Sequence, residues 1–334
     1  MKKEICIIGG GWYGCHLALF LKKKGFKITL FEKENDIFLG SSGFNQYRLH
    51  IGYHYPRSSE TIIEAKKNFK KFNKIYKTFI FYPKNNIYCI ANKESLIDFG
   101  TYIKILKGHR LNYKIKKFNF LKNIQGSIVS NEGVLLNKEI IKFFKNNLRN
   151  EIIYNTKIKS LKKIKEKYNF IIDCTNNTFK NNIGRNINYI LTLSHIYKKN
   201  TQKIVYPVTI MDGKLASIYP YAGKKHYFTL THSEYTHIKK FKSFKSLKEF
   251  SKKVSKSIIK KNRFLSEKSI SNFYINFTKH LSYKGFFLSF KIIEEEKSDK
   301  RGIVLKRNGN ILSICSPKIA NIFSAQEYIS KIIK

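Results

Sequence analysis

The sequence has few acidic residues, few cysteines, prolines and glycines, and no long apolar run. Its 334 residues include 22 Asp and Glu, 5 Cys, 5 Pro and 18 Gly. No segment approaches the roughly 18 apolar residues of a membrane-spanning helix, so we expect no membrane span. The low Gly, Pro and Cys contents exclude collagen-like chains and disulfide scaffolds. The five cysteines are scattered and form no C-x-x-C pair, which favours a reducing, cytoplasmic location.

The composition that remains is that of a globular protein with more than one domain. Hydrophobic residues make up 42% of the chain, close to the globular norm. A length of 334 residues also exceeds the roughly 250–300 residues at which one core stops growing, so two domains are expected.

The net charge of +43 does not by itself predict a polyanion partner. Of the 65 basic residues only 8 are Arg, and the lysines are interleaved with apolar residues along the chain. Arg is the better reader of bases and the better fork for phosphates. Lys, Ile, Asn, Phe and Tyr all have A/T-rich codons, so codon composition explains the bias, and nucleic acid is not the expected partner.

A glycine-rich turn stands near the start of the chain. Residues 5–8 are all apolar and predict a buried strand. Gly9, Gly11 and Gly14 follow at the G-x-G-x-x-G spacing, and apolar residues then recur at helical spacing. A second apolar strand is expected over residues 27–31. This strand–turn–helix–strand order is typical of a dinucleotide-binding unit.

Each part of such a unit has a physical task here. Gly9 allows the tight turn, Gly11 leaves room for a pyrophosphate against the backbone, and Gly14 lets helix and strand touch. The helix amino terminus offers N–H groups and partial positive charge to the phosphates. Glu32, at the end of the second strand, is placed to accept the ribose hydroxyls, which argues against NADP. The turn alone leaves FAD and NAD open.

The next segment favours FAD. Residues 36–59 form a long loop rich in Gly, Ser, aromatic and hydrogen-bonding residues, and loops of this length are usually functional. The run Gly40-Ser41-Ser42-Gly43-Phe44-Asn45 resembles the D-amino acid oxidase (glycine oxidase-like) superfamily of FAD-dependent oxidoreductases, in which such a loop runs beside the pyrophosphate. The continuation through Arg57 resembles a bacterial subfamily of that group. The resemblance implies FAD contacts from Gly9, Gly11, Trp12, Tyr13, Gly14, Glu32, Lys33, Ser41, Ser42, Asn45, Gln46 and Arg48.

Two later segments agree with the resemblance. Residues 168–177 form an apolar strand that ends in a polar turn, like the family strand over the adenosine half of FAD, with Asn where the family has Gly. Residues 302–315 predict a hairpin with an Asn308-Gly309 turn, followed by a helix that starts at Ser316 as N-cap and Pro317 in the first turn. The implied further FAD contacts are Lys157, Ile158, Cys174, Thr175, Asn176, Ser316, Pro317, Lys318 and Ile319.

The expected fold is α/β, with a Rossmann-like FAD-binding domain of the D-amino acid oxidase type and an inserted α+β substrate domain on an antiparallel sheet. The FAD-binding domain is expected over residues 1–82, 132–187 and 291–334, and the substrate domain over residues 83–131 and 188–290. Helices are expected over residues 93–106, 137–148 and 246–261.

The catalytic candidates lie in the long loop. Arg48 is expected beside the flavin or as a fork on a substrate carboxylate. His50 and His54 titrate near neutrality and are candidates for moving protons. The substrate candidates are Tyr53, Tyr55, Arg57, Tyr219 and His232. The H-x-x-x-H spacing of the two histidines suits a metal only on a helix, and Gly52 and Pro56 oppose a helix, so no metal is expected.

The resemblance implies an FAD-dependent oxidoreductase that oxidises a C–N or C–O bond of a small polar metabolite, such as an amino acid, amine or sugar derivative, by hydride transfer to flavin. The electron acceptor is oxygen or another carrier. Two alternatives stay open. One is a flavin-dependent enzyme without net redox chemistry, such as a nucleotide-sugar mutase. The other is an RNA-associated modifying flavoprotein, for which the positive charge would matter.

Overall fold

The computed structural model describes residues 3–179, 187–221, 224–294 and 303–333, and the chain divides into two compact units. Unit 1 comprises Met1–Asn45, Asn137–Asn188 and Lys291–Lys334, and unit 2 comprises Gln46–Leu136 and Tyr189–Phe290. Residues 46–82 and 132–136 thus belong with unit 2, and not with the nucleotide domain as expected from sequence. The reason is strand pairing, because short strands from both segments form one small sheet in unit 2.

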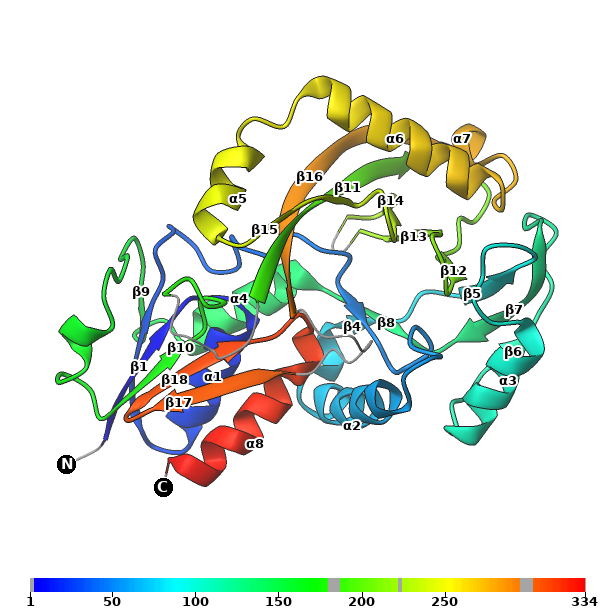
Figure 1. The fold of residues 1–334 in the computed structure, drawn as a ribbon. Coiled ribbons are helices and arrows are strands. Elements are labelled where there is room, and N and C mark those ends of the chain that lie inside the picture. Colours follow the sequence, from blue (N-terminus) through cyan, green and yellow to red (C-terminus); the bar gives the residue numbers. More distant parts are fainter. Residues whose placement is uncertain (1–2, 180–186, 222–223, 295–302, 334) are drawn as a thin grey trace. The chain divides into compact units, whose positions relative to one another are not determined.

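Unit 1 is built on a mixed sheet, which within the described residues has six strands in the order β17-β18-β10-β1-β2-β9 (Figure 1). Strands β9, β2, β1, β10 and β18 run parallel, and β17 is antiparallel to β18. Residues 5–8 are buried, as a parallel strand covered on both faces requires. The strands are β1 (Glu4–Ile8), β2 (Lys27–Phe31), β9 (Ile152–Ile153), β10 (Phe170–Asp173), β17 (Val304–Asn308) and β18 (Ile311–Cys315).

The helices of unit 1 pack around α1. This helix follows the glycine-rich turn and contacts β1, β2, α4 and α8. Its buried side includes Leu17 and Leu21, one turn apart on the face expected from the sequence. The helical segments are α1 (Trp12–Lys23), α4 (Asn137–Asn147), η2 (Lys162–Ile164), η3 (Ile319–Asn321) and α8 (Ile322–Ile332).

The expected start of the last helix is wrong, whereas the hairpin before it is confirmed. Its turn is shifted by one residue from the predicted Asn308-Gly309 pair: Asn308 ends β17 and pairs with Ile311, so Gly309, at φ +58°, and Asn310 join the two strands. Ser316 is not an N-cap: its hydroxyl accepts from the Lys318 amide at 3.3 Å, and Lys318 is extended. The helical turn therefore begins at Ile319, after Pro317. The expected hairpin start, Gly302, lies outside the described residues.

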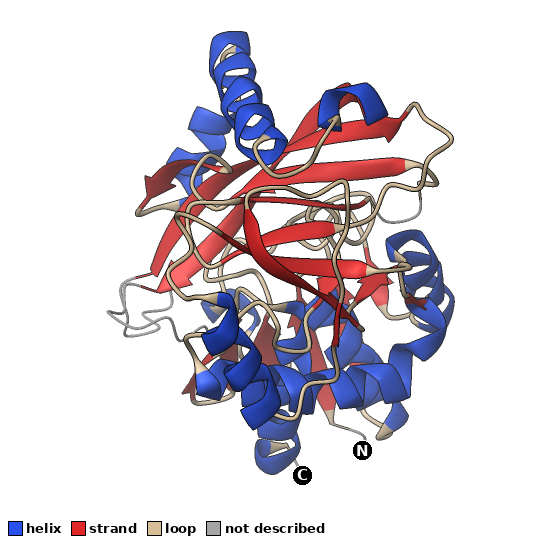
Figure 2. Ribbon diagram, turned by 90° about the vertical axis from the view of Figure 1, so that its right-hand side faces the viewer, coloured by secondary structure: helices blue, strands red, loops and turns tan. Residues whose placement is uncertain are grey.

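Unit 2 contains a large mixed sheet and a small one, drawn as red strands in Figure 2. The order of the large sheet is β15-β11-β14-β13-β12-β5-β7-β6, with β16 paired to β11, and the small sheet has the order β3-β8-β4. In both sheets, the strand pairs whose residue-by-residue register is known are antiparallel. The exception is the pair β12–β5 of the large sheet, which is parallel. The strands are β3 (Arg48–Leu49), β4 (Ile80–Phe81), β5 (Asn86–Ala91), β6 (Lys114–Ile115), β7 (Ile124–Ser130), β8 (Gly133–Leu135), β11 (Ile187–Lys199), β12 (Val208–Met211), β13 (Ala216–Pro220), β14 (Tyr227–His232), β15 (His237–Phe241) and β16 (Leu281–Glu294).

The helices of unit 2 lie beside these sheets, and α6 contacts β13 and β14. They are α2 (Ser59–Tyr76), η1 (Lys77–Phe79), α3 (Phe99–Gly108), α5 (Phe244–Ser251), α6 (Lys256–Ser271) and α7 (Phe277–His280). In the described part of the chain, none of the helices is both long enough and apolar enough to cross a membrane.

Two expected helix boundaries in unit 2 are wrong, and capping residues explain both. The helix expected over residues 93–106 begins at Phe99, because the Asp98 carboxylate caps it through the Thr101 amide at 2.8 Å. The helix expected over residues 246–261 is divided in two, because Ser243 caps α5 and Ser255 caps α6.

Candidate functional site

The glycine-rich turn of unit 1 is packed so closely that side chains would not fit. Gly9 has φ +103°, a conformation that other residues rarely adopt. A Cβ atom on Gly14 would lie 1.9 Å from the carbonyl oxygen of Gly9, and one on Gly11 would lie 2.9 Å from the Ser42 Oγ. The three glycines therefore hold α1 against the end of β1 and leave the backbone of the turn bare.

The Glu32 carboxylate faces this turn from the end of β2. It is largely buried, and its two oxygens accept from the Gly10 amide at 2.6 Å and the Glu34 amide at 3.0 Å. An ionised carboxylate offers about four acceptor positions. Glu32 can thus be fixed by two backbone amides and still accept the hydroxyls of a sugar.

The loop after Glu32 returns to the start of α1. The Trp12 amide donates to the Ser42 Oγ at 3.0 Å, and the Phe38 amide donates to the Gly10 carbonyl at 2.9 Å. The Asn45 side chain donates to the carbonyl of Ser41 at 2.9 Å, so in this structure it closes its own loop. Ser42 is thereby placed at the helix amino terminus.

Two more of the FAD contacts predicted in unit 1 are Tyr13, in the first turn of α1, and Lys33, which follows Glu32. The Tyr13 hydroxyl donates to the carbonyl of Lys318 at 2.7 Å, which ties α1 to the turn before η3. Lys33 instead forms an exposed ion pair with Glu34, with Nζ and Oε1 2.6 Å apart.

The end of β10 meets the glycine-rich turn from the other side. A Cβ atom on Gly9 would lie 3.1 Å from the Cys174 carbonyl oxygen. Asn176 has φ +58°, which is the left-handed conformation. Asn adopts this conformation more readily than most residues other than Gly, so it can stand where the family has Gly. The other two predicted contacts of this region, Lys157 and Ile158, have different surroundings. Lys157 is exposed, and Ile158 packs against a core cluster that contains Cys6 and Ile8.

Asp173 is a buried residue of this region that the sequence interpretation missed. Its Oδ1 accepts from the Thr175 amide at 2.9 Å and from the Thr175 hydroxyl at 2.6 Å, and its Oδ2 lies 3.4 Å from the Ser313 hydroxyl. Burial raises the pKa of Asp173, partly offset by these hydrogen bonds. A carboxylate at the end of an apolar strand was the signal that could have found it.

The residues of unit 1 fit a dinucleotide. The first turn of α1 carries no acidic side chain that would repel a phosphate, and Gly11 leaves its backbone open. Glu32 supplies the carboxylate for a ribose. These glycines leave the main chain of the turn without side chains, so a pyrophosphate can approach it.

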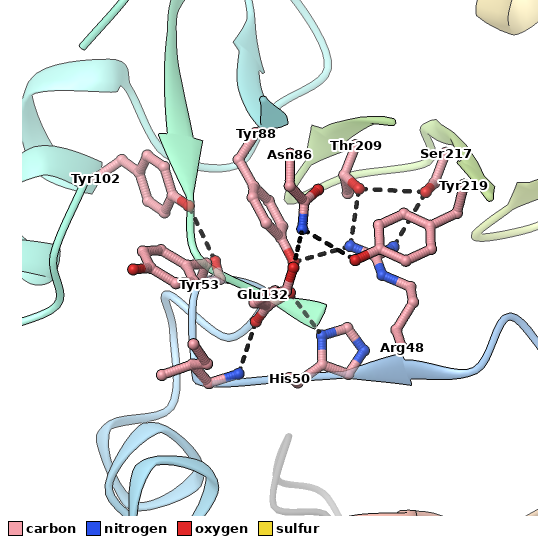
Figure 3. A network of polar contacts seen from close by, with 11 residues as sticks. Arg48, His50, Tyr53, Asn86, Tyr88, Tyr102, Glu132, Thr209, Ser217 and Tyr219 are labelled. Atoms are coloured by element: carbon pink, nitrogen blue, oxygen red, sulfur yellow. Dashed lines mark hydrogen bonds and ion pairs between the residues drawn. The ribbon is translucent and has the colours of Figure 1, made fainter. Parts of the chain in front are cut away.

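Unit 2 contains a second cluster of predicted residues, which is centred on Arg48 (Figure 3). The Arg48 Nη2 donates to the Tyr88 hydroxyl and to the Thr209 hydroxyl, both at 2.8 Å, and Nη1 donates to the Ser217 hydroxyl at 3.1 Å. The guanidinium also lies over the Tyr219 ring, 4.3 Å from its centroid.

The expectation that Arg48 forms a two-pronged clamp on a substrate carboxylate is not supported by this arrangement. Both hydrogens of Nη2 already have acceptors within the unit. A fork needs two parallel N–H groups, and Nη2 is not available as one of them. Arg48 instead joins β3 to β5, β12 and β13, the strands that carry its partners.

Glu132 is the main functional candidate that the sequence interpretation missed. Its side chain has no exposed surface, and it accepts from the Ile51 amide at 2.7 Å, from the Tyr88 hydroxyl, and from His50 Nδ1 at 3.3 Å. Burial alone would raise the pKa of Glu132, but the neighbouring His50, Arg48 and Tyr88 hold that pKa below its usual value. The carboxylate is therefore ionised, and Tyr88, whose own pKa is raised by burial, is a neutral donor to it.

His50 and His54 lie together beside Glu132. Their rings stack with centroids 5.1 Å apart, and the edge of Tyr55 meets both rings at 5.5 Å. The side chain of His50 is 25% exposed, and His54 and Tyr55 are also partly exposed, so solvent or a ligand can reach this side of the cluster. Residues 50–54 are not helical, as Gly52 and Pro56 led us to expect.

The predicted substrate residues divide into two groups. Tyr219 belongs to the Arg48 cluster, where its hydroxyl accepts from the Asn86 amide at 2.9 Å, and Tyr53 stacks on Tyr88. The other three are held elsewhere. Tyr55 packs against His50 and His54, Arg57 pairs with Asp212 at 2.7 Å, and His232 Nδ1 accepts backbone amides of its own turn. Burial lowers the pKa of His232. The structure therefore brings Tyr219 and Tyr53 to Arg48, and gives Arg57 and His232 local partners.

Comparisons with known proteins agree with the family and with the fold. The model of the FAD dependent oxidoreductase (DAO) family matches residues 4–263. The FAD-dependent monooxygenase FPY4 of Fusarium mangiferae is 31% identical over 98% of this chain and 90% of its own length. The structure of L-α-glycerophosphate oxidase from Mycoplasma pneumoniae with FAD bound is similar with a TM-score of 0.72, at 12% identity over 100% of this chain and 95% of that one.

A further likeness concerns the fold alone. Glycine oxidase from Geobacillus kaustophilus is similar with a TM-score of 0.70, at 10% identity over 96% of this chain and 91% of that chain. The expected α/β architecture of the D-amino acid oxidase type is thus confirmed.

Proposed function

The chain belongs to the family of FAD-dependent oxidoreductases of the D-amino acid oxidase type, and we propose that it oxidises a C–N or C–O bond of a small polar metabolite. Its cofactor is FAD, which accepts a hydride when bound. The names of two proteins of similar structure support the choice of bonds, since a glycine oxidase acts on a C–N bond and an L-α-glycerophosphate oxidase on a C–O bond. The proposed electron acceptor is oxygen or another carrier.

In this proposal unit 1 holds the cofactor. The backbone of the turn at Gly11 and the amino terminus of α1 take the pyrophosphate, because they offer N–H groups and no side chain. Glu32 takes a ribose, since it keeps acceptor positions beyond its two backbone bonds. Ser42, Thr175 and the turn before η3 complete the proposed cradle.

The observation that carries the chemical part is the partly exposed His50 on a buried polar cluster. An alcohol must lose its O–H proton as its C–H hydride leaves, and an amine that binds as an ammonium ion must lose an N–H proton before the hydride leaves. An imidazole near neutral pH is suited to accept either proton. We assign this role to His50, with His54 and Tyr55 fixing the plane of its ring. Arg48 holds the cluster together through the hydroxyls of Tyr88, Thr209 and Ser217.

The test is to mix the purified yellow protein with glycine, L-proline or L-α-glycerophosphate in the absence of oxygen. Reduction of the flavin is measured as the loss of its visible absorbance. We expect one chemical class to reduce the flavin, and His50→Asn to retain FAD but slow the reduction by about 10²- to 10⁴-fold. His237→Asn is the matched control, because His237 is an exposed histidine of the same unit, and it should react normally.

Three results would contradict the proposal. One is unchanged reduction in His50→Asn. Another is turnover of a nucleotide sugar without net oxidation, which is the mutase alternative. The third is salt-dependent retention of RNA together with activity on RNA alone. Admission of oxygen after reduction then separates an oxidase from an enzyme that needs another carrier.

A further inference from the structure

We propose that Glu132 is the positioning residue of His50: its carboxylate holds the imidazole in the form protonated on Nδ1, so that Nε2 is the nitrogen that accepts a proton. The inference deepens the proposed function and rests on it for its kinetic consequence. Its structural part, the position of a proton on His50, can be tested without knowing what the enzyme oxidises.

The first argument is that Glu132 can only accept. Its carboxylate is ionised, and three donors converge on it: the Ile51 amide at Oε1, and the Tyr88 hydroxyl and His50 Nδ1 at Oε2. An ionised carboxylate has no hydrogen to donate. A neutral His50 must therefore carry its hydrogen on Nδ1, which leaves the lone pair on Nε2.

The second argument is that the backbone fixes the pair. Strands β3 and β8 are antiparallel, with Arg48 opposite Val134 and Leu49 opposite Gly133. One further step in this register places His50 opposite Glu132. The Asn86 side chain also donates to the Glu132 carbonyl at 3.3 Å, so the main chain of Glu132 is held as well as its carboxylate.

The third argument is that the charge of Glu132 is balanced inside the same unit. The Tyr88 hydroxyl accepts from the Arg48 guanidinium at 2.8 Å and donates to Glu132 (Figure 3). A buried carboxylate without a nearby cation would tend to take up a proton. The chain from Arg48 through Tyr88 thus keeps Glu132 in the ionised form that orients His50.

The experiment is nitrogen NMR of the FAD-loaded full chain labelled with ¹⁵N in its histidines. The His50 signals are assigned by their disappearance in His50→Asn. At a pH at which His50 is neutral, we expect the Nδ1 signal of the wild type to be of the protonated type and the Nε2 signal to be of the unprotonated type. A wild type with its proton on Nε2 would overturn the inference without any variant of Glu132.

The discriminating variant is Glu132→Gln. The Ile51 amide is a fixed donor, so the amide oxygen of the new side chain should turn to it and the NH₂ group should face His50. Nδ1 then becomes an acceptor, and the proton moves to Nε2. We expect the two nitrogen signals to exchange character, and flavin reduction by the active probe compound to slow by about 10²- to 10⁴-fold while FAD stays bound.

Ser217→Ala is the matched control. It removes one partner of Arg48 but leaves the Arg48–Tyr88–Glu132 chain and the Glu132–His50 contact, so His50 should keep its proton on Nδ1. Retention of the Nδ1 proton in Glu132→Gln would overturn the inference. If the signals exchange as expected but His50→Asn reduces the flavin at the normal rate, the positioning is right and the proposed role of His50 in oxidation is wrong.

Discussion

At the level of single residues, the sequence predicts those functional positions that belong to a local motif. Gly9, Gly11 and Gly14 stand at fixed spacing in one turn, and Glu32 follows at the end of the next strand, so a short stretch of chain contains the whole pattern. Glu132 has no such context. It lies 82 residues from His50, and only the pairing of β3 with β8 brings the two together.

The buried His16 leads to a prediction about pH and stability. It lies on α1, with Nε2 2.8 Å from the Gln326 Oε1 on α8, and burial lowers its pKa to about 4. The unfolded chain takes up a proton near pH 6.5, whereas the folded chain resists it until about pH 4, so stability falls as the pH drops through this range. We expect His16 to account for a loss of about 3 kcal/mol between those limits.

The measurement is urea unfolding at several pH values for the wild type and for His16→Leu. The variant removes the titrating group, and its free energy of unfolding should depend less on pH between 6.5 and 4. A difference between the two proteins that stays constant with pH would show that folding does not lower the pKa of His16.

At the level of elements, the sequence predicts where strands lie better than where helices begin. Apolar runs such as residues 5–8 and 170–172 are long enough to mark strands by themselves. Helix starts depend on which of several polar residues becomes the cap. Asp98 and Ser255 do so here, whereas Ser316 bonds within its own turn and leaves the helix to begin at Ile319.

The junction of β1 and α1 leads to a prediction at this scale. In Gly14→Ala the new methyl group would collide with the Gly9 carbonyl, 1.9 Å away, so the helix must move off the strand. We expect a loss of about 1–3 kcal/mol in the free energy of unfolding and weaker FAD binding. Thermal unfolding and the FAD content of the purified variant check both.

Gly108→Ala is the control for that substitution. Gly108 is the last residue of α3, and a Cβ atom there would meet nothing within 4 Å. Its stability should stay within about 0.5 kcal/mol of the wild type, with the normal FAD content. A fully FAD-loaded and stable Gly14→Ala protein would contradict the assigned packing.

At the level of the whole molecule, the family and the α/β fold follow from segments at both ends of the chain, whereas the division into units does not. Residues 46–82 follow the glycine-rich loop directly and were expected to share its domain. They belong to unit 2 because β3 and β4 pair with β8. Such pairing depends on contacts between distant segments, and no local pattern near residue 46 records it.

The proposed placement of FAD in unit 1 leads to a prediction about the stability of the whole chain. A ligand that binds only the folded protein stabilises it by about 2.7 kcal/mol when its free concentration is 100 times the Kd. Added FAD should therefore raise the thermal midpoint of the apoprotein. Gly11→Val should abolish this rise, because the larger side chain would fill the pyrophosphate position and press on Ser42.

His50→Asn makes the comparison specific, because His50 belongs to unit 2 and has no proposed contact with the pyrophosphate. It should respond to FAD as the wild type does, whatever its effect on flavin reduction. Calorimetry of the three proteins with and without FAD separates the cases. An undiminished response in Gly11→Val would move the pyrophosphate away from the turn at Gly11, since a bulky side chain there cannot share the space with a phosphate group.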